Sequence, residues 1–191
     1  MTYTYNMLYT RKGDTGTTKS FKSGPGERKS KSSCQTEALG ALDELNSFLG
    51  LVKVKCAGVS WAVNEKQPAE IVAWTQNCLF SIQAEVASAD KRVGQGKVAE
   101  MEKWIDAMEE ELPPIKTFFI SGGTELAALF DVSRTLARKA ERRVVAGVEA
   151  GEFRADAATL AFLNRLSSLL YALARLTNHK SGITEQPPTY D

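Results

Sequence analysis

Apolar residues recur at alternating steps of four and three through most of this chain, which is the spacing of an α-helix that buries one face. The clearest stripe is Ala38, Leu42, Leu45, Leu49, Val52 and Cys56. It predicts a first helix that begins near Ser32, where Ser32 and Gln35 have capping-box spacing, and ends at about Lys55. Because such seams pack against one another in bundles, this spacing constrains the fold class more than any other feature.

Four more segments have this periodicity. The second helix is predicted to begin at Pro68 and to bury Val72, Thr75, Leu79, Ile82 and Val86. The third follows Gly94 and Gly96, carries Met101, Ile105, Met108 and Leu112, and stops at Pro113. The fourth, at about 125–148, has the inward stripe Leu126, Leu129, Val132, Leu136, Ala140 and Val144. The fifth, capped by Asp156, buries Leu160, Leu163, Leu166, Leu170 and Leu173 and ends near Asn178.

Five helices joined by mostly short connections predict an all-α, antiparallel five-helix bundle. We expect one domain, 1–191, made of an N-terminal loop (7–31), the bundle (32–178) and a short tail (179–191). The segment 118–124 is predicted to be a packed loop, with a strand as the alternative.

Composition excludes several classes of protein. Lysine and arginine number 24 against 23 acidic residues, a formal charge of +1, so no global basic field favours nucleic acid. No run of about 18 apolar residues predicts a membrane span, and residues 1–5 lack the order of a signal peptide, so we expect a cytoplasmic protein. Cys34, Cys56 and Cys78 are expected to be reduced and buried, and His179 to be a helix-end cation.

Two constellations suggest anion binding. Residues 9–18 are rich in glycine, threonine and cations, and the basic run 27–31 follows, so this stretch resembles half of a phosphate site without Walker spacing. In the predicted fourth helix, Arg134, Arg138, Lys139, Arg142 and Arg143 concentrate positive charge, and Glu37, Asp43 and Glu44 of the first helix offer partners. The alternatives are a solvated helix face for the arginines, a polar stripe for Asn164, and core packing for Phe118.

Three separated motifs occur in order: YTRKGDTGTT (9–18), EALGALDELNS (37–47), and RKAERR (138–143) followed by LNRLS (163–167). Together they resemble the PduO-type ATP:cob(I)alamin adenosyltransferases over roughly residues 7–178. The resemblance implies that reduced cobalt, in cob(I)alamin, attacks the 5′ carbon of ATP and releases triphosphate. It also implies Mg²⁺, a homotrimer with sites between subunits, and as further partners a flavoprotein reductase and an adenosylcobalamin-dependent enzyme.

The same resemblance assigns site residues. It implies Arg138 as the catalytic contact to the phosphates and Asp43 with Arg134 as a pair that bridges subunits. Phe118 matches the aromatic residue beneath the corrin, which excludes the lower axial ligand. The implied ATP contacts are Thr10, Arg11, Lys12, Gly13, Thr18, Lys19, Lys31, Lys139, Glu141, Arg142 and Asn164.

The sequence departs from the family pattern at four places. Lys139 stands where an arginine is usual, Ser121 where a proline is usual, and Ser168 where an acid is usual, and residues 21–26 are slightly expanded. These departures motivate an alternative, a non-catalytic bundle that binds or escorts ATP and corrinoid. A plain helical interaction protein is the third hypothesis.

Overall fold

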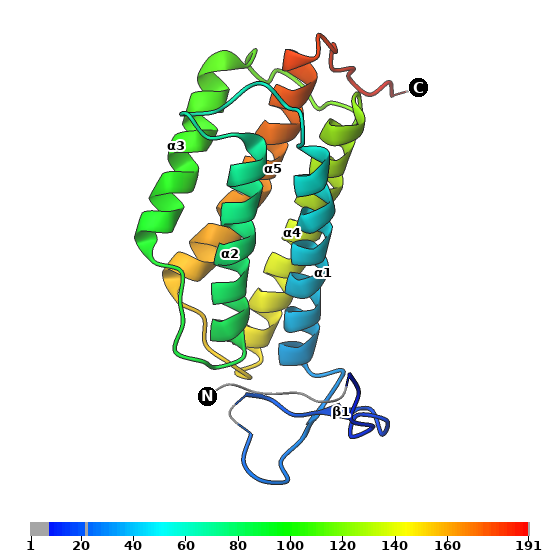
Figure 1. Ribbon diagram of the computed structural model, residues 1–191, viewed down its shortest axis with the longest axis vertical. Helices are drawn as coiled ribbons and strands as arrows, with labels where there is room; N and C mark the ends of the chain where they lie inside the picture. The colour runs from blue at the N-terminus through cyan, green and yellow to red at the C-terminus, as the bar shows by residue number, and fades with distance from the viewer. Residues whose placement is uncertain (1–7, 22, 191) are drawn as a thin grey trace.

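Five long helices stand side by side in the computed structural model, which describes residues 8–21 and 23–190 (Figure 1). They are α1 (Cys34–Lys55), α2 (Pro68–Val86), α3 (Gln95–Glu111), α4 (Glu125–Glu149) and α5 (Ala157–Lys180), and they alternate in direction. The predicted antiparallel five-helix bundle is therefore confirmed. Residues 1–7, 22 and 191, which belong to the predicted loop and tail, lie outside the described residues.

The helices enclose one apolar core. α1 packs against α2 and α4, and α5 packs against α4 and α3. Trp74 connects α2 to the two helices across from it. Its side chain contacts Trp104 of α3, with the aromatic ring centroids 4.8 Å apart, and Phe162 of α5. The stripes predicted for α1, α2 and α3 are all buried, so hydrophobic periodicity placed these three helices correctly.

The stripe predicted for α4 is correct at Ala140 and Val144, which are buried, but wrong at Val132. Val132 is 44% exposed, whereas the small residues Ala127, Ala137 and Ala140 are buried. Small side chains let α4 approach both α1 and α5 closely, and the fully buried Phe130 lies on the same inward side of the helix. Val132 is thereby left on an outer face of α4.

The N-termini of two helices are capped by residues that are remote in sequence. The predicted capping box of Ser32 is wrong, because Ser33 caps α1 and accepts a hydrogen bond from the backbone N–H of Thr36. The Glu152 carboxylate also accepts from the first two amides of α1, at 3.1 and 2.9 Å. A carboxylate there complements the helix dipole.

Helix α5 has a similar arrangement. Asp156 occupies the N-cap position, but its carboxylate pairs with Arg92 at 3.1 Å instead of capping the helix. The buried Glu85 of α2 takes over, since its carboxylate accepts from the Asp156 N–H at 2.7 Å and from the Thr159 hydroxyl at 2.5 Å. Two further boundaries differ from expectation: α3 begins before Gly96, and α5 continues to Lys180.

The substitution Glu152→Gln is expected to lower the free energy of unfolding by about 0.5–1 kcal/mol at pH 7. The Gln35 N–H, the largest cause, together with Cys34 and Lys29, holds the pKa of the Glu152 carboxyl below its ordinary value. The stabilisation is therefore present above the unfolded-state pKa, about 4.3, and is lost as pH falls through the lower folded-state pKa. Urea unfolding of Glu152→Gln and of the exposed control Glu149→Gln at pH 7 and 3 measures this. An equal deficit at both pH values would contradict the assignment.

A small hairpin, absent from the prediction, precedes the bundle. β1 (Thr17–Thr18) and β2 (Lys29–Ser30) pair antiparallel, with Thr17 opposite Ser30 and Thr18 opposite Lys29. Figure 1 shows this hairpin at the end of the bundle where α1 begins. The segment 118–124 is a loop at the opposite end, as predicted, but Phe118 and Ile120 are exposed, so the prediction that it packs is wrong for them.

Helix α5 is long and apolar enough to cross a membrane by length and composition alone, with a mean hydropathy of 1.3 over its most apolar window. More than half of that window is buried inside the bundle. This apolarity accordingly matches the position of α5 as a core helix, which contacts both α3 and α4.

The three cysteines are free thiols, as expected, but they are not equally buried. Cys56 and Cys78 are buried, and burial raises the pKa of each thiol to about 11. Cys34 is only half-buried, because it opens α1 next to the hairpin. The prediction of burial is therefore wrong for Cys34.

Candidate functional site

The N-terminal loop and the hairpin bring together residues that are distant in the sequence. The Lys31 N–H donates to the Gly16 carbonyl at 2.9 Å. A Cβ atom at Gly13 would lie 3.2 Å from the Lys31 ammonium nitrogen. Because glycine has no side chain, the ammonium can occupy this position without a close contact. The remaining cations and hydroxyl of the predicted phosphate loop, Thr10, Arg11, Lys12 and Lys19, are exposed.

A cavity of about 460 Å³, here called the hairpin pocket, opens between the hairpin, α1 and α4. Three of the predicted ATP contacts line it: Thr18, Lys31 and Lys139. The Lys139 ammonium lies 2.5 Å from a Glu44 carboxylate oxygen, and Arg143 lies 3.7 Å from Glu37. The predicted partnership between α1 acids and α4 cations is thus confirmed for Glu44 and Glu37.

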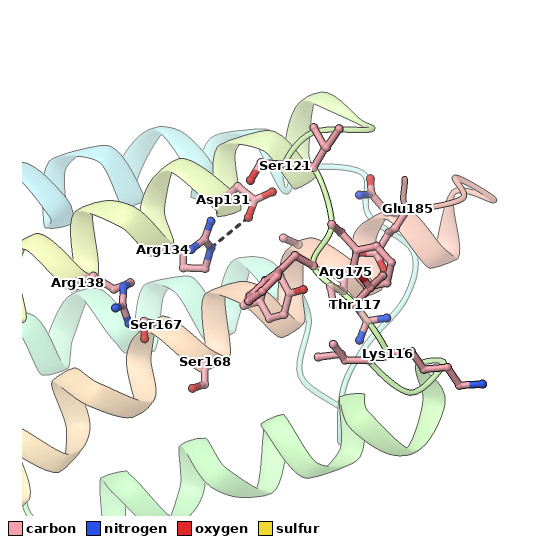
Figure 2. A pocket seen from close by; sticks show the side chains of 17 residues that line it. Lys116, Thr117, Ser121, Asp131, Arg134, Arg138, Ser167, Ser168, Arg175 and Glu185 are labelled. Atoms are coloured by element: carbon pink, nitrogen blue, oxygen red, sulfur yellow. Dashed lines mark hydrogen bonds and ion pairs between the residues drawn. The ribbon is translucent and has the colours of Figure 1, made fainter. Parts of the chain in front are cut away.

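A larger cavity of about 660 Å³, here called the Phe118 pocket, lies at the other end of the bundle. The loop 115–121 forms one wall, and α4 and α5 form the others (Figure 2). Phe118 is 80% exposed, so core packing, the alternative considered for it, is excluded. Ser121 and Ser168, two of the departures from the family pattern, also line this pocket.

Two arginines of α4 line the Phe118 pocket in different states. Arg134 pairs with Asp131 at 3.2 Å, and its guanidinium lies 5.8 Å from the centroid of the Tyr171 ring. Arg138 is exposed and makes no ion pair with any residue that the structure describes. Figure 2 shows both arginines on the side of α4 that faces α5. Arg138 therefore keeps its five N–H donors free for an anion.

The loop that carries Phe118 is fixed by a buried arginine. Arg175 of α5 is 5% exposed and pairs with Glu185 of the C-terminal segment at 2.9 Å. It also donates to the Pro113 carbonyl at 3.0 Å and lies 5.3 Å from the centroid of the Phe119 ring. One guanidinium thus connects α5, the loop and the C-terminal segment.

Asn178 fixes the other end of this loop. Its amide nitrogen donates to the Gly122 carbonyl at 2.8 Å, and its amide oxygen accepts from the Thr124 N–H at 3.1 Å. Gly123 has φ +99°, and a Cβ there would lie 2.3 Å from the Asn178 amide oxygen, so glycine is required. Sequence reasoning missed Arg175 and Asn178; the available signal was two polar residues on an apolar helix.

The other predicted residues lie outside both pockets. The Asn164 amide donates to the Glu141 carboxylate at 3.1 Å, which links α5 to α4. Arg142 is exposed on α4 and Asp43 on α1. Within this chain Arg134 pairs with Asp131 and not with Asp43, so the pair predicted between subunits stays a prediction.

Helix α4 connects the two pockets. Arg138 lines the Phe118 pocket and Lys139, the next residue, lines the hairpin pocket. Successive residues of an α-helix point about 100° apart, so the pockets open on different sides of α4. The middle of α4 therefore presents one cation to each cavity.

The family model described as cobalamin adenosyltransferase matches residues 8–177. The corrinoid adenosyltransferase of Bacillus subtilis (strain 168) is 37% identical over 180 residues, which cover 92% of this chain and 89% of that protein. The corrinoid adenosyltransferase PduO of Citrobacter freundii is 36% identical over 90% of this chain but only 50% of that protein. A solved structure, a variant PduO-type ATP:corrinoid adenosyltransferase from Lactobacillus reuteri complexed with cobalamin and ATP, superposes with a TM-score of 0.81 at 27% identity, covering 95% and 96% of the two chains.

Proposed function

This chain belongs to the cobalamin adenosyltransferase family and is an ATP:corrinoid adenosyltransferase, and we propose that ATP occupies its hairpin pocket and the corrin ring its Phe118 pocket. The observation that carries this assignment is the position of Arg138 beside Lys139. From one turn of α4, these two residues supply a cation to each cavity, and the reaction needs such cations near the phosphates of ATP.

In the proposed reaction, the cobalt of cob(I)alamin attacks the 5′ carbon of ATP. A cobalt–carbon bond forms, the bond from the 5′ carbon to oxygen breaks, and its electron pair leaves with triphosphate. The corrinoid supplies the nucleophile, so the protein needs to orient the two substrates and to stabilise the leaving charge. Arginine donors preorganised at the phosphates perform that second task.

On the ATP side, Lys31 and Lys139 supply ammonium groups and Thr18 supplies a hydroxyl to the phosphates. The exposed residues Thr10 to Lys12 and Lys19 are placed before and within the hairpin segment, where they would complete the phosphate cradle together with Arg142. We further propose that Glu141 and Asn164, which hydrogen-bond to each other, contact the nucleoside.

Mg²⁺ would reach this site with ATP. Among residues 8–21 and 23–190 no group of three His, Cys, Asp or Glu side chains is arranged to hold a metal ion. Mg²⁺ is commonly bound through substrate phosphates with few protein ligands, and Glu37 and Thr36 offer oxygen atoms in the hairpin pocket. When bound, the ion would neutralise phosphate charge.

On the corrin side, the exposed ring of Phe118 offers an apolar face beneath the macrocycle, where it would exclude the lower axial ligand of cobalt. Arg175 and Asn178 hold the Phe118 loop at both ends, although Ser121 stands where the family usually has a proline. This supports a preformed surface for the corrin ring.

We propose that the protein works as one domain in a homotrimer with each active site between two subunits. The two pockets open on different sides of α4, so the hairpin pocket of one subunit can face the Phe118 pocket of the next. Asp43 on α1 and Arg134 with Val132 on α4 would lie in this interface. A cytoplasmic location, a flavoprotein reductase as the electron donor and an adenosylcobalamin-dependent enzyme as the recipient complete the proposal.

Turnover and assembly are tested together. Incubating the protein with ATP, Mg²⁺ and chemically reduced cobalamin should convert the corrin spectrum to that of adenosylcobalamin, with one triphosphate released per corrinoid. Light scattering of the same sample should give the mass of three chains.

Three results would contradict the proposal. Corrinoid binding without triphosphate release would support the escort alternative. Absence of ATP binding would support a plain interaction protein, and full turnover by a monomer would contradict the shared site.

A further inference from the structure

Gln35 lies at the junction between the hairpin and the bundle, and its buried side chain uses both ends of its amide. It is 2% exposed. Its amide nitrogen donates to the Val86 carbonyl, the last of α2, at 2.6 Å. Its amide oxygen accepts from the Lys29 ammonium at 2.8 Å and from the Ser20 hydroxyl at 3.5 Å. The side chain thus ties the hairpin to the helices.

The strand that carries Lys29 also positions the hairpin pocket. Lys29 lies opposite Thr18 in the hairpin, and Thr18 lines the pocket. Lys31, which also lines the pocket, follows Lys29 by two residues. A hairpin of two strands with two residues each is marginally stable alone, so its position depends on what holds it to the bundle.

The two lysines of this segment have different surroundings. Lys29 faces the bundle, where the Gln35 amide oxygen binds its ammonium and the Glu152 carboxylate contacts the Gln35 N–H. Lys31 faces the pocket and lies beside Gly13. Lys29 therefore serves as the anchor of the strand, while the Lys31 ammonium has no partner among residues 8–21 and 23–190 and faces the pocket.

We propose that Gln35, acting through Lys29, is a positioning residue that fixes Lys31 and Thr18 in the geometry that binds the phosphates of ATP. This inference rests on the assignment of ATP to the hairpin pocket. Without the anchor, the hairpin must be ordered when ATP binds, and this ordering weakens binding. The transfer step and the corrinoid site, at the other end of the bundle, should change little.

Calorimetric titration with MgATP, without corrinoid, tests this in the full chain. Gln35→Leu keeps the size of the buried side chain but loses its three hydrogen bonds, and we expect the Kd for ATP to rise about 10-fold. Lys29→Met should produce a similar rise. The double variant should bind no more weakly than either single variant, because both remove the same contact. In turnover assays the KM for ATP should rise, with kcat and the KM for corrinoid within twofold of the original.

A matched control separates positioning from general stability. Gln76→Leu also removes a glutamine that joins two elements, since the Gln76 amide donates to the Asn46 carbonyl at 3.0 Å, but it does not contact the hairpin. It should lower the Tm and leave the Kd for ATP unchanged.

Two outcomes would overturn the proposal. One is a lower Tm with an unchanged Kd in Gln35→Leu. The other is an unchanged Kd in Lys29→Met, which remains decisive if Gln35→Leu does not fold. A protein that binds ATP but forms no adenosylcobalamin would instead refute the proposed reaction, while this binding test would still stand.

Discussion

Replacing Arg138 with alanine should lower kcat by about 100- to 1,000-fold, the loss typical for one preorganised donor to a developing negative charge. Arg138 lines the Phe118 pocket, directly precedes Lys139 of the hairpin pocket, and has no ion-pair partner among the described residues. Its donors are thus available to the leaving triphosphate. Arg138→Lys should recover part of the activity, because lysine keeps the charge but loses the planar fork.

The matched control for this prediction is Arg154→Ala. Arg154 is also an exposed arginine, but it lies in the connection between α4 and α5, outside both pockets. Both variants should unfold within about 0.5 kcal/mol of the original, since neither side chain is buried. Single-turnover measurements with saturating ATP and cob(I)alamin isolate the transfer step, and near-normal turnover in Arg138→Ala would refute the assigned role.

Replacing Phe118 with alanine should reduce kcat/KM for the corrinoid by about 10- to 100-fold without changing stability. The ring is 80% exposed in the free protein, so its removal costs the fold little. Covering a phenylalanine ring with an apolar ligand contributes about 1.5–3 kcal/mol, and this contribution is lost in the variant. The Kd for ATP should stay unchanged, because Phe118 does not line the hairpin pocket.

Phe80→Ala is the control for this second prediction. Phe80 is 64% exposed on α2 and lines neither pocket. The visible spectrum of bound cob(II)alamin adds a readout, since loss of the ring should shift it toward the form with a lower axial ligand. If Phe118→Ala keeps both the original spectrum and the original kcat/KM, the corrin does not rest on this ring.

Much of the bundle could be predicted from periodicity because its helices bury large apolar residues. The stripe from Ala38 to Cys56 was correct at each position. The stripe of α4 was correct at Ala140 and Val144 but not at Val132, because a helix with two neighbours is packed partly through small residues such as Ala137, which hydrophobicity ranks below valine. Periodicity therefore identified helix α4 and only part of the face that it buries.

The remaining errors concern contacts between distant segments. Local capping rules predicted Ser32 and Asp156 as caps. Asp156 does occupy the N-cap position of α5, but Ser33 caps α1, and Glu152 and Glu85 add carboxylates from other parts of the chain. No sequence window contains both partners, so only the fold reveals these caps. The two-residue strands were missed because they have too few residues to show an alternating pattern.

The motif resemblance singled out residues that the fold places in cavities, but not the residues that support those cavities. Lys31 and Lys139 line the hairpin pocket, and Arg138 lines the Phe118 pocket. The resemblance did not identify Arg175, Asn178 or Gln35, which act on loops and not on a substrate. Such residues depend on how the elements meet, and that information is absent from a motif.

Because Arg175 pairs with Glu185, variants of this protein that are shortened at the C-terminus should retain Glu185. The Arg175 guanidinium borders both the Phe118 pocket and a smaller cavity of about 250 Å³ behind the loop. A truncation before Glu185 would leave that buried charge without its carboxylate. Fusions are better inserted at the exposed turn of Asn64 and Glu65, which lines neither the Phe118 pocket nor the hairpin pocket.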